Sequence, residues 1–377
     1  MNIDLSRYSR QLVLPGVGPE GQEKLGRARV LIVGAGGLGS PVALYLAAGG
    51  VGTLGIADPD TVDVSNLQRQ ILHDTPSAGL LKVDSAGMRM GALNPDIRVE
   101  KIPSRVTAKN ALEIIGKYDI VVDGTDRIST RFLLNDACHF TRKPLVYGAV
   151  FRFEGQATVF LPEGPCYRCA YPGPGAGEPM NCAEGGVLGV LPGIIGLIQA
   201  TEVMKLILGM GEGLAGRLLL YDALSMKFRE LKVVRDRSCN LCGDNPSIKQ
   251  LADASEECNS RKGEGVGMFN LFGGGVPGIS ATELKVLLEV QVVKTVLVDV
   301  REKSEWDFGH IEGAKHIPLG QLAGRMKELD PRLPTVTYCR SGARSSQAAS
   351  IMKKAGFTDV RNLSGGMIAW EMAGNQG

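Results

Sequence analysis

Between positions 29 and 150, apolar residues occur in short runs, each followed by a glycine-containing turn and a stretch with helical spacing. This alternation is typical of βαβ units and predicts a parallel sheet. The runs at 29–34 and 119–124, RVLIVG and DIVVDG, have the continuous apolar pattern of buried strands. Further strands are expected at 53–58, 98–103 and 144–150, and helices near 38–48, 77–92 and 127–140.

The next part of the chain, residues 151–242, has a mixed pattern. Strands are expected at 157–162 and 217–222, and an apolar helix at 188–208. Between 243 and 278 the composition becomes polar and glycine-rich without steady periodicity, as is typical of a linker.

A second α/β pattern closes the chain. It has a helical stretch at 279–289 and buried strands at 295–300 and 335–339. The class is therefore α/β throughout, with a Rossmann-like sheet first and a smaller α/β domain second. The boundaries we predict are a first domain at 1–250, a linker at 251–275 and a second domain at 276–377.

Composition narrows the possible functions. The chain has 377 residues, with 42 Lys and Arg against 40 Asp and Glu, so its net charge is only +2. Such a balance gives no electrostatic basis for nucleic-acid binding. Hydrophobic residues make up 44%, which is enough for more than one buried core and excludes wholesale disorder.

No membrane span or export signal is expected. Residues 30–57 carry no charge, but glycines divide their apolar residues into short blocks. The first residues, MNIDLSRYSRQ, lack the apolar core of a signal peptide, so we expect a cytoplasmic protein. The eight cysteines then need an explanation other than disulfides, because the cytosol is reducing.

A glycine-rich loop follows the first strand. Gly34, Gly36 and Gly39 have the spacing G-x-G-x-x-G and precede a helix, whose N-terminal N–H groups attract anions. Asp58 ends the next strand, where a carboxylate can bind ribose hydroxyls, and this place disfavours the alternative of an ordinary solvated strand-end carboxylate. These features alone fit an NAD-dependent dehydrogenase equally well.

Two cations favour a nucleoside triphosphate over a dinucleotide. Arg69 and Lys82 are expected beside the glycine-rich loop, although each taken alone could be an ordinary surface charge. Asp126 follows the buried strand at 119–124, where ligand sites of open α/β sheets gather, and could hold Mg²⁺ or simply form a turn.

Taken together, these segments resemble the ubiquitin-activating-like adenylyltransferases of the MoeB and ThiF type. The resemblance covers residues 1 to about 250. It implies that ATP reacts with the C-terminal glycine carboxylate of a small ubiquitin-like sulfur carrier ending in Gly-Gly. The segments that carry the resemblance are RYSRQ (7–11), VGAGGLGSP (33–41), DPDTVDVSNLQRQ (58–70), LKVDSA (81–86) and GTD (124–126).

The resemblance also implies roles for single residues. It implies a homodimer in which Arg10 reaches the partner's ATP. Arg127 occupies the position after the Mg²⁺ aspartate where this family usually has asparagine. The residues implied for the ATP and Mg²⁺ site are Gly37, Asp58, Ser65, Asn66, Arg69, Lys82 and Asp126.

Four cysteines form two matched C-x-x-C pairs. Cys166 with Cys169, and Cys239 with Cys242, have the spacing at which each pair supplies half of a tetrahedral Zn²⁺ site. Four thiolates leave no open coordination position, so we predict a structural zinc. Buried or redox cysteines are the alternative.

Cys182 lies in EPMNCAEGG, a segment containing Pro and Gly. A lone cysteine is more often a small hydrophobe than a nucleophile. The resemblance nevertheless implies a cysteine in a crossover loop near the adenylate, which would attack the acyl-adenylate or exchange persulfide and disulfide bonds. Cys138 and Cys258 are not expected to be catalytic.

Cys339 is the strongest candidate nucleophile in the sequence. It ends a strand and begins CRSGAR (339–344), which precedes a helical stretch. We expect the loop's N–H groups, Arg340, Arg344 and the helix N-terminus to favour a thiolate. Phosphatase loops have five residues between Cys and Arg, whereas here there are four, a tighter ring that suits sulfane sulfur.

CRSGAR and the segment at 298–319 resemble a single-domain rhodanese over residues 276–377. His310 and His316 are expected to be structural, and Trp306 and Trp370 to be packing residues. The whole chain then resembles adenylyltransferase/sulfurtransferases of the MoeZ type. In that interpretation a persulfide on Cys339, loaded from thiosulfate or a partner's persulfide, converts the activated carrier to a thiocarboxylate.

Two other classes remain open at the level of sequence. An NAD-dependent oxidoreductase would use the glycine-rich loop and Asp58, but leaves Arg69, Lys82 and the cysteine pairs unexplained. A non-catalytic scaffold for ubiquitin-like proteins would keep the fold, although the intact CRSGAR loop argues against it.

Overall fold

The computed structural model describes residues 6–171, 186–253, 278–279, 281–290 and 295–374. Its internal contacts separate two compact units, Met1–Gly265 and Val266–Gly377. Each unit contains its own sheet and its own hydrophobic clusters.

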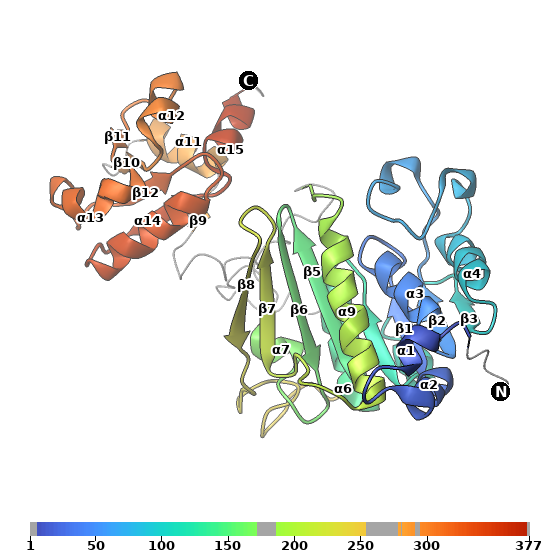
Figure 1. Cartoon of the computed structure of the whole chain (residues 1–377). Helices are drawn as coiled ribbons and strands as arrows, with labels where there is room; N and C mark the ends of the chain where they lie inside the picture. Colours follow the sequence, from blue (N-terminus) through green and yellow to red (C-terminus); the bar gives the residue numbers. More distant parts are fainter. Residues whose placement is uncertain (1–5, 172–185, 254–277, 280, 291–294, 375–377) are drawn as a thin grey trace. The chain divides into compact units, whose positions relative to one another are not determined.

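Unit one is built on a mixed eight-stranded sheet of order β3-β2-β1-β4-β5-β6-β7-β8 (Figure 1). The pairs from β3 across to β5 are parallel and those from β5 to β8 are antiparallel. The strands are β1 Arg29–Val33, β2 Thr53–Ala57, β3 Arg98–Ile102, β4 Ile120–Asp123, β5 Leu145–Phe151, β6 Glu154–Phe160, β7 Arg217–Asp222 and β8 Lys227–Lys232.

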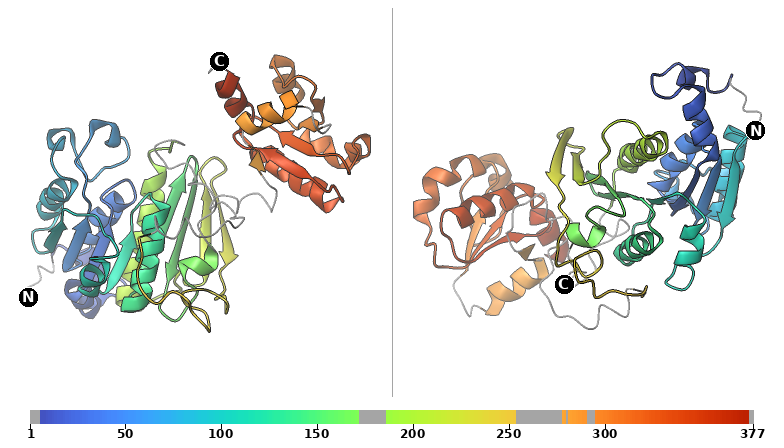
Figure 2. Two further views of the ribbon diagram at one scale, coloured as in Figure 1. Left: turned by 180° about the vertical axis from the view of Figure 1, so that it is seen from behind. Right: turned by 90° about the horizontal axis from the view of Figure 1, so that it is seen from below.

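Helices cover both faces of this sheet. The long apolar helix α9, Leu191–Leu208, packs against α3, β5 and β6, and α6, Ile128–Thr141, lies on the opposite face (Figure 2). By length and composition alone α9 could cross a membrane, but half of that apolar stretch is buried within the protein, as in a core helix. The other helices are α1 Ser9–Leu12, α2 Gly18–Arg27, α3 Gly39–Ala48, α4 Lys82–Leu93, α5 Ala111–Gly116 and α7 Tyr167–Ala170, with short 3₁₀ turns at Val64–Asn66 and Thr75–Ser77.

The order β3-β2-β1-β4 gives β1 and β4 adjacent positions at the centre of the parallel part. Val33 pairs with Ala57 on one side and with Asp123 on the other. The loops after β1, β2 and β4 therefore leave the sheet at the same edge. In open α/β sheets this carboxyl edge is where ligands bind.

The predicted α/β class and parallel sheet are confirmed, with one misplaced helix start. A helix was expected from residue 77, but α4 begins at Lys82. Thr75–Ser77 instead form a 3₁₀ turn capped by Asp74, and Leu81 has ψ 135°, which ends any helical continuation. Strand β8 was not anticipated because all six of its residues are exposed and it lacks an apolar pattern.

Unit two has a five-stranded sheet of order β11-β10-β12-β13-β9 in which every pair is parallel. Clusters around Val298 and Met352, and around Leu284 and Tyr338, give it a two-sided core. Its elements are β9 Gly278–Ile279, α11 Ala281–Val290, β10 Val296–Asp299, α12 Lys303–Phe308, β11 Lys315–His316, α13 Leu322–Arg325, β12 Thr335–Tyr338, α14 Ala343–Lys354, β13 Val360–Leu363 and α15 Gly366–Gly374.

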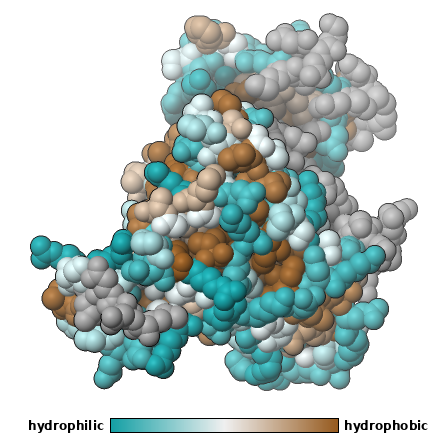
Figure 3. All heavy atoms as spheres, turned by 90° about the vertical axis from the view of Figure 1, so that its right-hand side faces the viewer, coloured by the Kyte–Doolittle hydropathy of each residue, from teal (hydrophilic) through white to brown (hydrophobic). Residues whose placement is uncertain are grey.

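Apolar side chains also reach the surface of unit one. Figure 3 shows apolar patches on the side of the molecule that carries α4. A hollow of about 470 Å³ between α3 and α4 is lined by Leu44, Tyr45, Ala48, Arg89, Ala92 and Leu93. Its lining comes from the C-terminal halves of both helices, away from the glycine-rich loop at the start of α3.

Candidate functional site

The glycine-rich loop after β1 is a close backbone crossing that requires glycine. Gly34 has φ +96°, and a Cβ there would lie 2.6 Å from the carbonyl oxygen of Gly124. A Cβ on Gly39 would lie 1.9 Å from the carbonyl oxygen of Gly34. The loop thus packs directly on the segment that follows β4, and α3 starts at Gly39 with its N–H groups at the sheet edge.

Asp58, just after the end of β2, is hydrogen-bonded to this loop. Its Oδ2 accepts a hydrogen bond of 2.8 Å from the Ala35 N–H, and its Oδ1 accepts one of 2.9 Å from the Asp60 N–H. Lys82, at the start of α4, is buried with its Nζ 3.9 Å from Asp58 Oδ1 and 3.3 Å from Asp60 Oδ2. The loop, the β2 carboxylate and the α4 cation therefore form one cluster.

The segment between β2 and α4 brings Arg69 to the loop. The Cγ of Arg69 lies 3.6 Å from the position of a Cβ on Gly37. Ser65 and Asn66 precede it in a turn capped by Asp63, whose Oδ1 accepts a 2.8 Å bond from the Ser65 N–H. The carbonyl of Asn66 accepts the Arg69 N–H at 3.1 Å, which fixes the backbone of that residue.

Asp126 is exposed just past the end of β4, two residues after Gly124. Before it, the fully buried Asp123 accepts the N–H and hydroxyl of Thr125 at 2.9 and 2.7 Å. Burial raises the pKa of the Asp123 carboxyl, and the charge of the Arg131 guanidinium lowers it by a smaller amount. Arg131 donates to the Thr125 carbonyl at 3.1 Å, so Thr125 is held on both sides.

Most of the residues proposed for ATP and Mg²⁺ therefore lie along one sheet edge. Arg69 lies beside Gly37, Lys82 lies within 3.9 Å of Asp58, and the chain leading to Asp126 packs on Gly34. Arg10 is exposed on the short helix α1, and within the described part of the chain no hydrogen bond or ion pair joins it to the loop.

Cys182 lies outside the described residues, but the chain that follows it is described from Gly186 onward. A Cβ on Gly189 would lie 2.4 Å from Oε1 of Gln68, and the Cβ of Pro192 lies 3.0 Å from the position of a Cβ on Gly37. The start of α9 thus packs against the glycine-rich loop and the segment that carries Arg69.

The four paired cysteines come together in unit one. Their sulfurs all lie within 4.8 Å of one another, and the closest contact, between Cys169 and Cys242, is 3.3 Å. In a tetrahedral zinc–thiolate site neighbouring sulfurs are about 3.8 Å apart, so this donor set fits the ion. The Asp236 N–H donates to the Cys169 sulfur at 3.4 Å, a contact that orients the sulfur and stabilises its thiolate.

The pKa values of two thiols in this cluster shift in opposite directions. A hydrogen bond between Cys166 and Cys169 raises the pKa of the Cys166 thiol and lowers the pKa of Cys169. Cys138, by contrast, is buried in α6, and burial raises the pKa of its thiol. That environment disfavours a thiolate at Cys138, which was not expected to be catalytic.

Cys339 follows β12 and is almost fully buried in its loop. Its sulfur accepts from the Gly342 N–H at 3.1 Å and from the Ser345 hydroxyl at 3.3 Å. The N-terminus of α15 closes on the loop, because the Met367 N–H donates to the Cys339 carbonyl at 2.8 Å. The loop therefore points donors at the sulfur, as a thiolate or persulfide requires.

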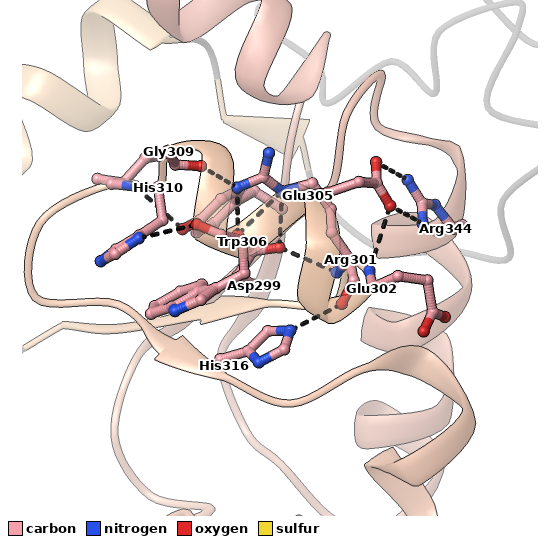
Figure 4. A network of polar contacts seen from close by, with 11 residues as sticks. Asp299, Arg301, Glu302, Glu305, Trp306, Gly309, His310, His316 and Arg344 are labelled. Atoms are coloured by element: carbon pink, nitrogen blue, oxygen red, sulfur yellow. Dashed lines mark hydrogen bonds and ion pairs between the residues drawn. The ribbon is translucent and has the colours of Figure 1, made fainter.

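Arg344 has a partner that the sequence did not reveal. Its two terminal nitrogens donate to the carboxylate of Glu305 on α12, at 2.7 Å each (Figure 4). The hydrogen bond from Arg344 lowers the pKa of Glu305 to about 2. The guanidinium of Arg344, which was expected to favour a thiolate at Cys339, is therefore also held by an ion pair with Glu305.

Further polar and aromatic contacts hold the segment that carries Glu305. Arg301 pairs with the buried Asp299 at 2.6 Å and donates to the Gly309 carbonyl at 2.6 Å (Figure 4). Trp306 stacks on His310 with ring centroids 3.6 Å apart and on His316 at 4.9 Å. These contacts fix α12, which carries Glu305, beside β10 and β11.

Comparison with known proteins agrees with this geometry. The ThiF family matches residues 8–243 and the Rhodanese-like domain matches residues 280–373. The probable adenylyltransferase/sulfurtransferase MoeZ of Mycobacterium tuberculosis is 43% identical over 97% of this chain and 93% of that protein. The sulfur carrier protein adenylyltransferase of Thermus thermophilus is 51% identical over 68% of this chain and 98% of that protein.

Among solved structures, the crystal structure of Escherichia coli MccB matches with a TM-score of 0.58. It is 22% identical and covers 67% of this chain and 76% of that one, a likeness of fold only. The matched families and the relatives of similar length define an ATP-using adenylation enzyme joined to a sulfurtransferase. The chain belongs to the ThiF family and carries a rhodanese-like domain after it.

The predicted family, fold class and enzyme class are thus confirmed, and the interpretation as an NAD-dependent oxidoreductase is excluded. Sequence reasoning missed Glu305 and Ser345. Glu305 precedes the noted Trp306, and Ser345 follows the last residue of the noted loop. Both are ordinary polar residues in sequence, and only the packing of α12 and α14 shows their contacts.

Proposed function

We propose that this enzyme adenylates the C-terminal glycine of a small ubiquitin-like carrier protein ending in Gly-Gly and then replaces AMP by sulfur to give the thiocarboxylate. The observation that carries the proposal is the cluster of Arg69, Lys82 and Asp58 on the glycine-rich loop. The attack of a carboxylate on an α-phosphate brings two anions together, and such cations stabilise that approach.

Individual roles follow from position. The N–H groups at the start of α3 and Arg69 would bind the phosphates, and Lys82 would neutralise charge developing at the α-phosphate. Asp58 would bind the ribose, with Ser65 and Asn66 completing the site from the capped turn. Gly37 allows the backbone to approach the nucleotide closely, and Arg10 would reach it from the partner in a homodimer.

Asp126 is the residue we assign to Mg²⁺. Its carboxylate is exposed at the sheet edge, and carboxylate oxygens are the ligands this cation prefers. When bound, Mg²⁺ would neutralise the pyrophosphate leaving group. Asp123 and Arg131 hold the neighbouring Thr125, so the chain that carries Asp126 is fixed.

The second half-reaction belongs to Cys339. The terminal sulfur of its persulfide, loaded from thiosulfate or from a partner's persulfide, attacks the acyl-adenylate carbonyl and AMP leaves. The product is an acyl disulfide between carrier and Cys339. Cys182, as a thiolate, then attacks the Cys339 sulfur, which releases the carrier thiocarboxylate and leaves a disulfide between the two cysteines for an external thiol to reduce.

Two observations support these assignments. The N–H of Gly342 and the hydroxyl of Ser345 stabilise negative sulfur at Cys339. The chain after Cys182 packs on the glycine-rich loop at Gly37, next to the proposed adenylate position. We further propose that Cys166, Cys169, Cys239 and Cys242 hold a structural Zn²⁺ and that the enzyme works in the cytoplasm.

The experiment that tests the proposal combines the purified chain with MgATP, thiosulfate, dithiothreitol and a small carrier protein ending in Gly-Gly. Carrier-dependent exchange of pyrophosphate into ATP reports the first step, and a mass gain of 16 Da at the carrier C-terminus, from oxygen to sulfur, reports the second. Exchange that needs no carrier, or a carrier of unchanged mass, would contradict the proposal.

A further inference from the structure

Ala35 lies in the glycine-rich loop, and side chains hold its peptide groups from two directions. Its N–H donates to Asp58 Oδ2 at 2.8 Å. Its carbonyl lies 2.9 Å from Nε2 of His73, a buried histidine in the segment that also carries Arg69. A carbonyl can only accept, so Nε2 of His73 carries the proton and donates it.

The other ring nitrogen connects His73 to α4. Its Nδ1 lies 2.9 Å from the hydroxyl of Ser85, which is also buried. Burial lowers the pKa of His73, so the ring is neutral near pH 7 and Nδ1 accepts the Ser85 hydroxyl proton. Ser85 stands three residues after Lys82 on the same helix.

We propose that His73 is a positioning residue for adenylation, which sets the glycine-rich loop against the helix that carries Lys82. The inference rests on the proposed function, because the distance between the glycine-rich loop and Lys82 matters for adenylation only if both bind ATP. The chain of contacts runs from the Ala35 carbonyl through the imidazole to Ser85, one helical turn from Lys82.

Two features distinguish this arrangement from a histidine that only fills space. Both ring nitrogens are satisfied, and both partners belong to elements of the nucleotide site. The same short segment places Arg69 against Gly37 and His73 against Ala35, so one stretch of chain contacts two residues of the loop. Loss of the imidazole would leave the buried Ala35 carbonyl without a donor.

The test uses three variants of the whole chain in carrier-dependent pyrophosphate exchange. His73→Leu keeps much of the volume and removes both bonds. The loss of a bond that leaves a buried group unpartnered corresponds to a change of roughly fivefold to a hundredfold in an equilibrium constant, so we expect the KM for ATP to rise at least fivefold. The KM for the carrier should stay the same.

His73→Gln places an amide N–H near the Nε2 position and should recover most of the ATP affinity. Ser85→Ala removes only the bond to Nδ1 and should have an intermediate effect. His139→Leu is the matched control, because this partly buried histidine of α6 makes no contact with the loop in the described structure. It should leave the KM for ATP unchanged.

The outcomes separate this inference from the proposed function. If the wild-type chain shows no exchange, the proposed function fails, and calorimetric binding of MgATP to the same variants still tests His73. An ATP affinity in His73→Leu equal to that of the wild type, or a glutamine variant no better than the leucine variant, would overturn the inference. If His73→Leu does not fold, Ser85→Ala decides, and wild-type affinity in that variant counts against the inference.

Discussion

Glu305 on α12 accepts two hydrogen bonds of 2.7 Å from Arg344, the residue that ends the loop begun by Cys339. The pair joins two elements that the sequence separates by 39 residues. Arg344 lies in the first turn of α14, where the CRSGAR loop meets that helix. Its contact with Glu305 therefore holds the loop in place against α12.

We therefore expect Glu305→Gln to lower thiosulfate:cyanide sulfurtransferase activity by about tenfold, because a neutral amide holds the guanidinium less firmly. Pyrophosphate exchange, a reaction of unit one, should not change. Asp307→Asn, which alters an exposed acid of the same helix that pairs with Lys303 and not with Arg344, is the matched control. Equal losses in both variants would show that Glu305 only stabilises the helix.

The second prediction concerns Asp126. Asp126→Ala should reduce Mg²⁺-dependent pyrophosphate exchange by at least a hundredfold, because the leaving group loses its proposed metal ligand. Arg127→Ala changes the neighbouring exposed residue and should reduce exchange by less than about threefold. Full exchange in Asp126→Ala would remove this carboxylate from the site.

The third prediction concerns the cysteine cluster. Elemental analysis of the purified chain should find one Zn²⁺ per chain, and Cys166→Ser or Cys242→Ser should lower both the zinc content and the Tm, because metal binding is coupled to folding. Cys138→Ser, in the same unit but outside the cluster, should keep the zinc. A metal-free chain with an unchanged Tm would contradict the assignment.

Features formed by residues close together in the sequence were predicted, whereas contacts between residues far apart in the sequence were not. The buried strands, the glycine-rich loop and the cysteine pairs are local patterns, and the sequence predicted them. Glu305 and His73 act through contacts with residues 39 and 38 positions away, which no spacing rule indicates. The start of α4 was misplaced because the capped turn at Thr75–Ser77 is polar and short.

The fourth prediction concerns pH. Glu154 on β6 pairs across the sheet with Asp222 on β7, and burial, followed by the charge of Asp222, raises the pKa of Glu154 from 4.5 to about 7. A raised carboxyl pKa means that its stabilising contribution is fully present below pH 4.5 and is lost as the pH rises through about 7.

The neutral variant Glu154→Gln should consequently gain stability over the wild type at high pH. We expect a gain of about 1–2 kcal/mol in the free energy of unfolding at pH 8.5 and almost none at pH 4.5. Urea unfolding at both pH values measures this difference. Glu163→Gln, at an exposed position of the same unit, should show no such pH dependence, and equal gains at both pH values in Glu154→Gln would refute the argument.

The last prediction separates the two reactive cysteines. Cys339 lies in a loop that directs the Gly342 N–H and the Ser345 hydroxyl at its sulfur, so sulfur loading should depend on it. Cys339→Ala should abolish both thiosulfate:cyanide sulfurtransferase activity and thiocarboxylate formation, yet leave carrier-dependent pyrophosphate exchange at the wild-type rate.

Cys182→Ala should keep both partial reactions, which are pyrophosphate exchange and thiosulfate:cyanide sulfur transfer. It should slow only the formation of thiocarboxylate, because its proposed step comes after the acyl disulfide has formed. Mass spectrometry of a reaction run without dithiothreitol then distinguishes the variants: the Cys182 variant should accumulate carrier attached to Cys339 through a disulfide, and later addition of dithiothreitol should release the carrier. Thiocarboxylate formed at the normal rate by Cys339→Ala, with thiosulfate as donor, would make the rhodanese-like domain a docking module and not the source of sulfur.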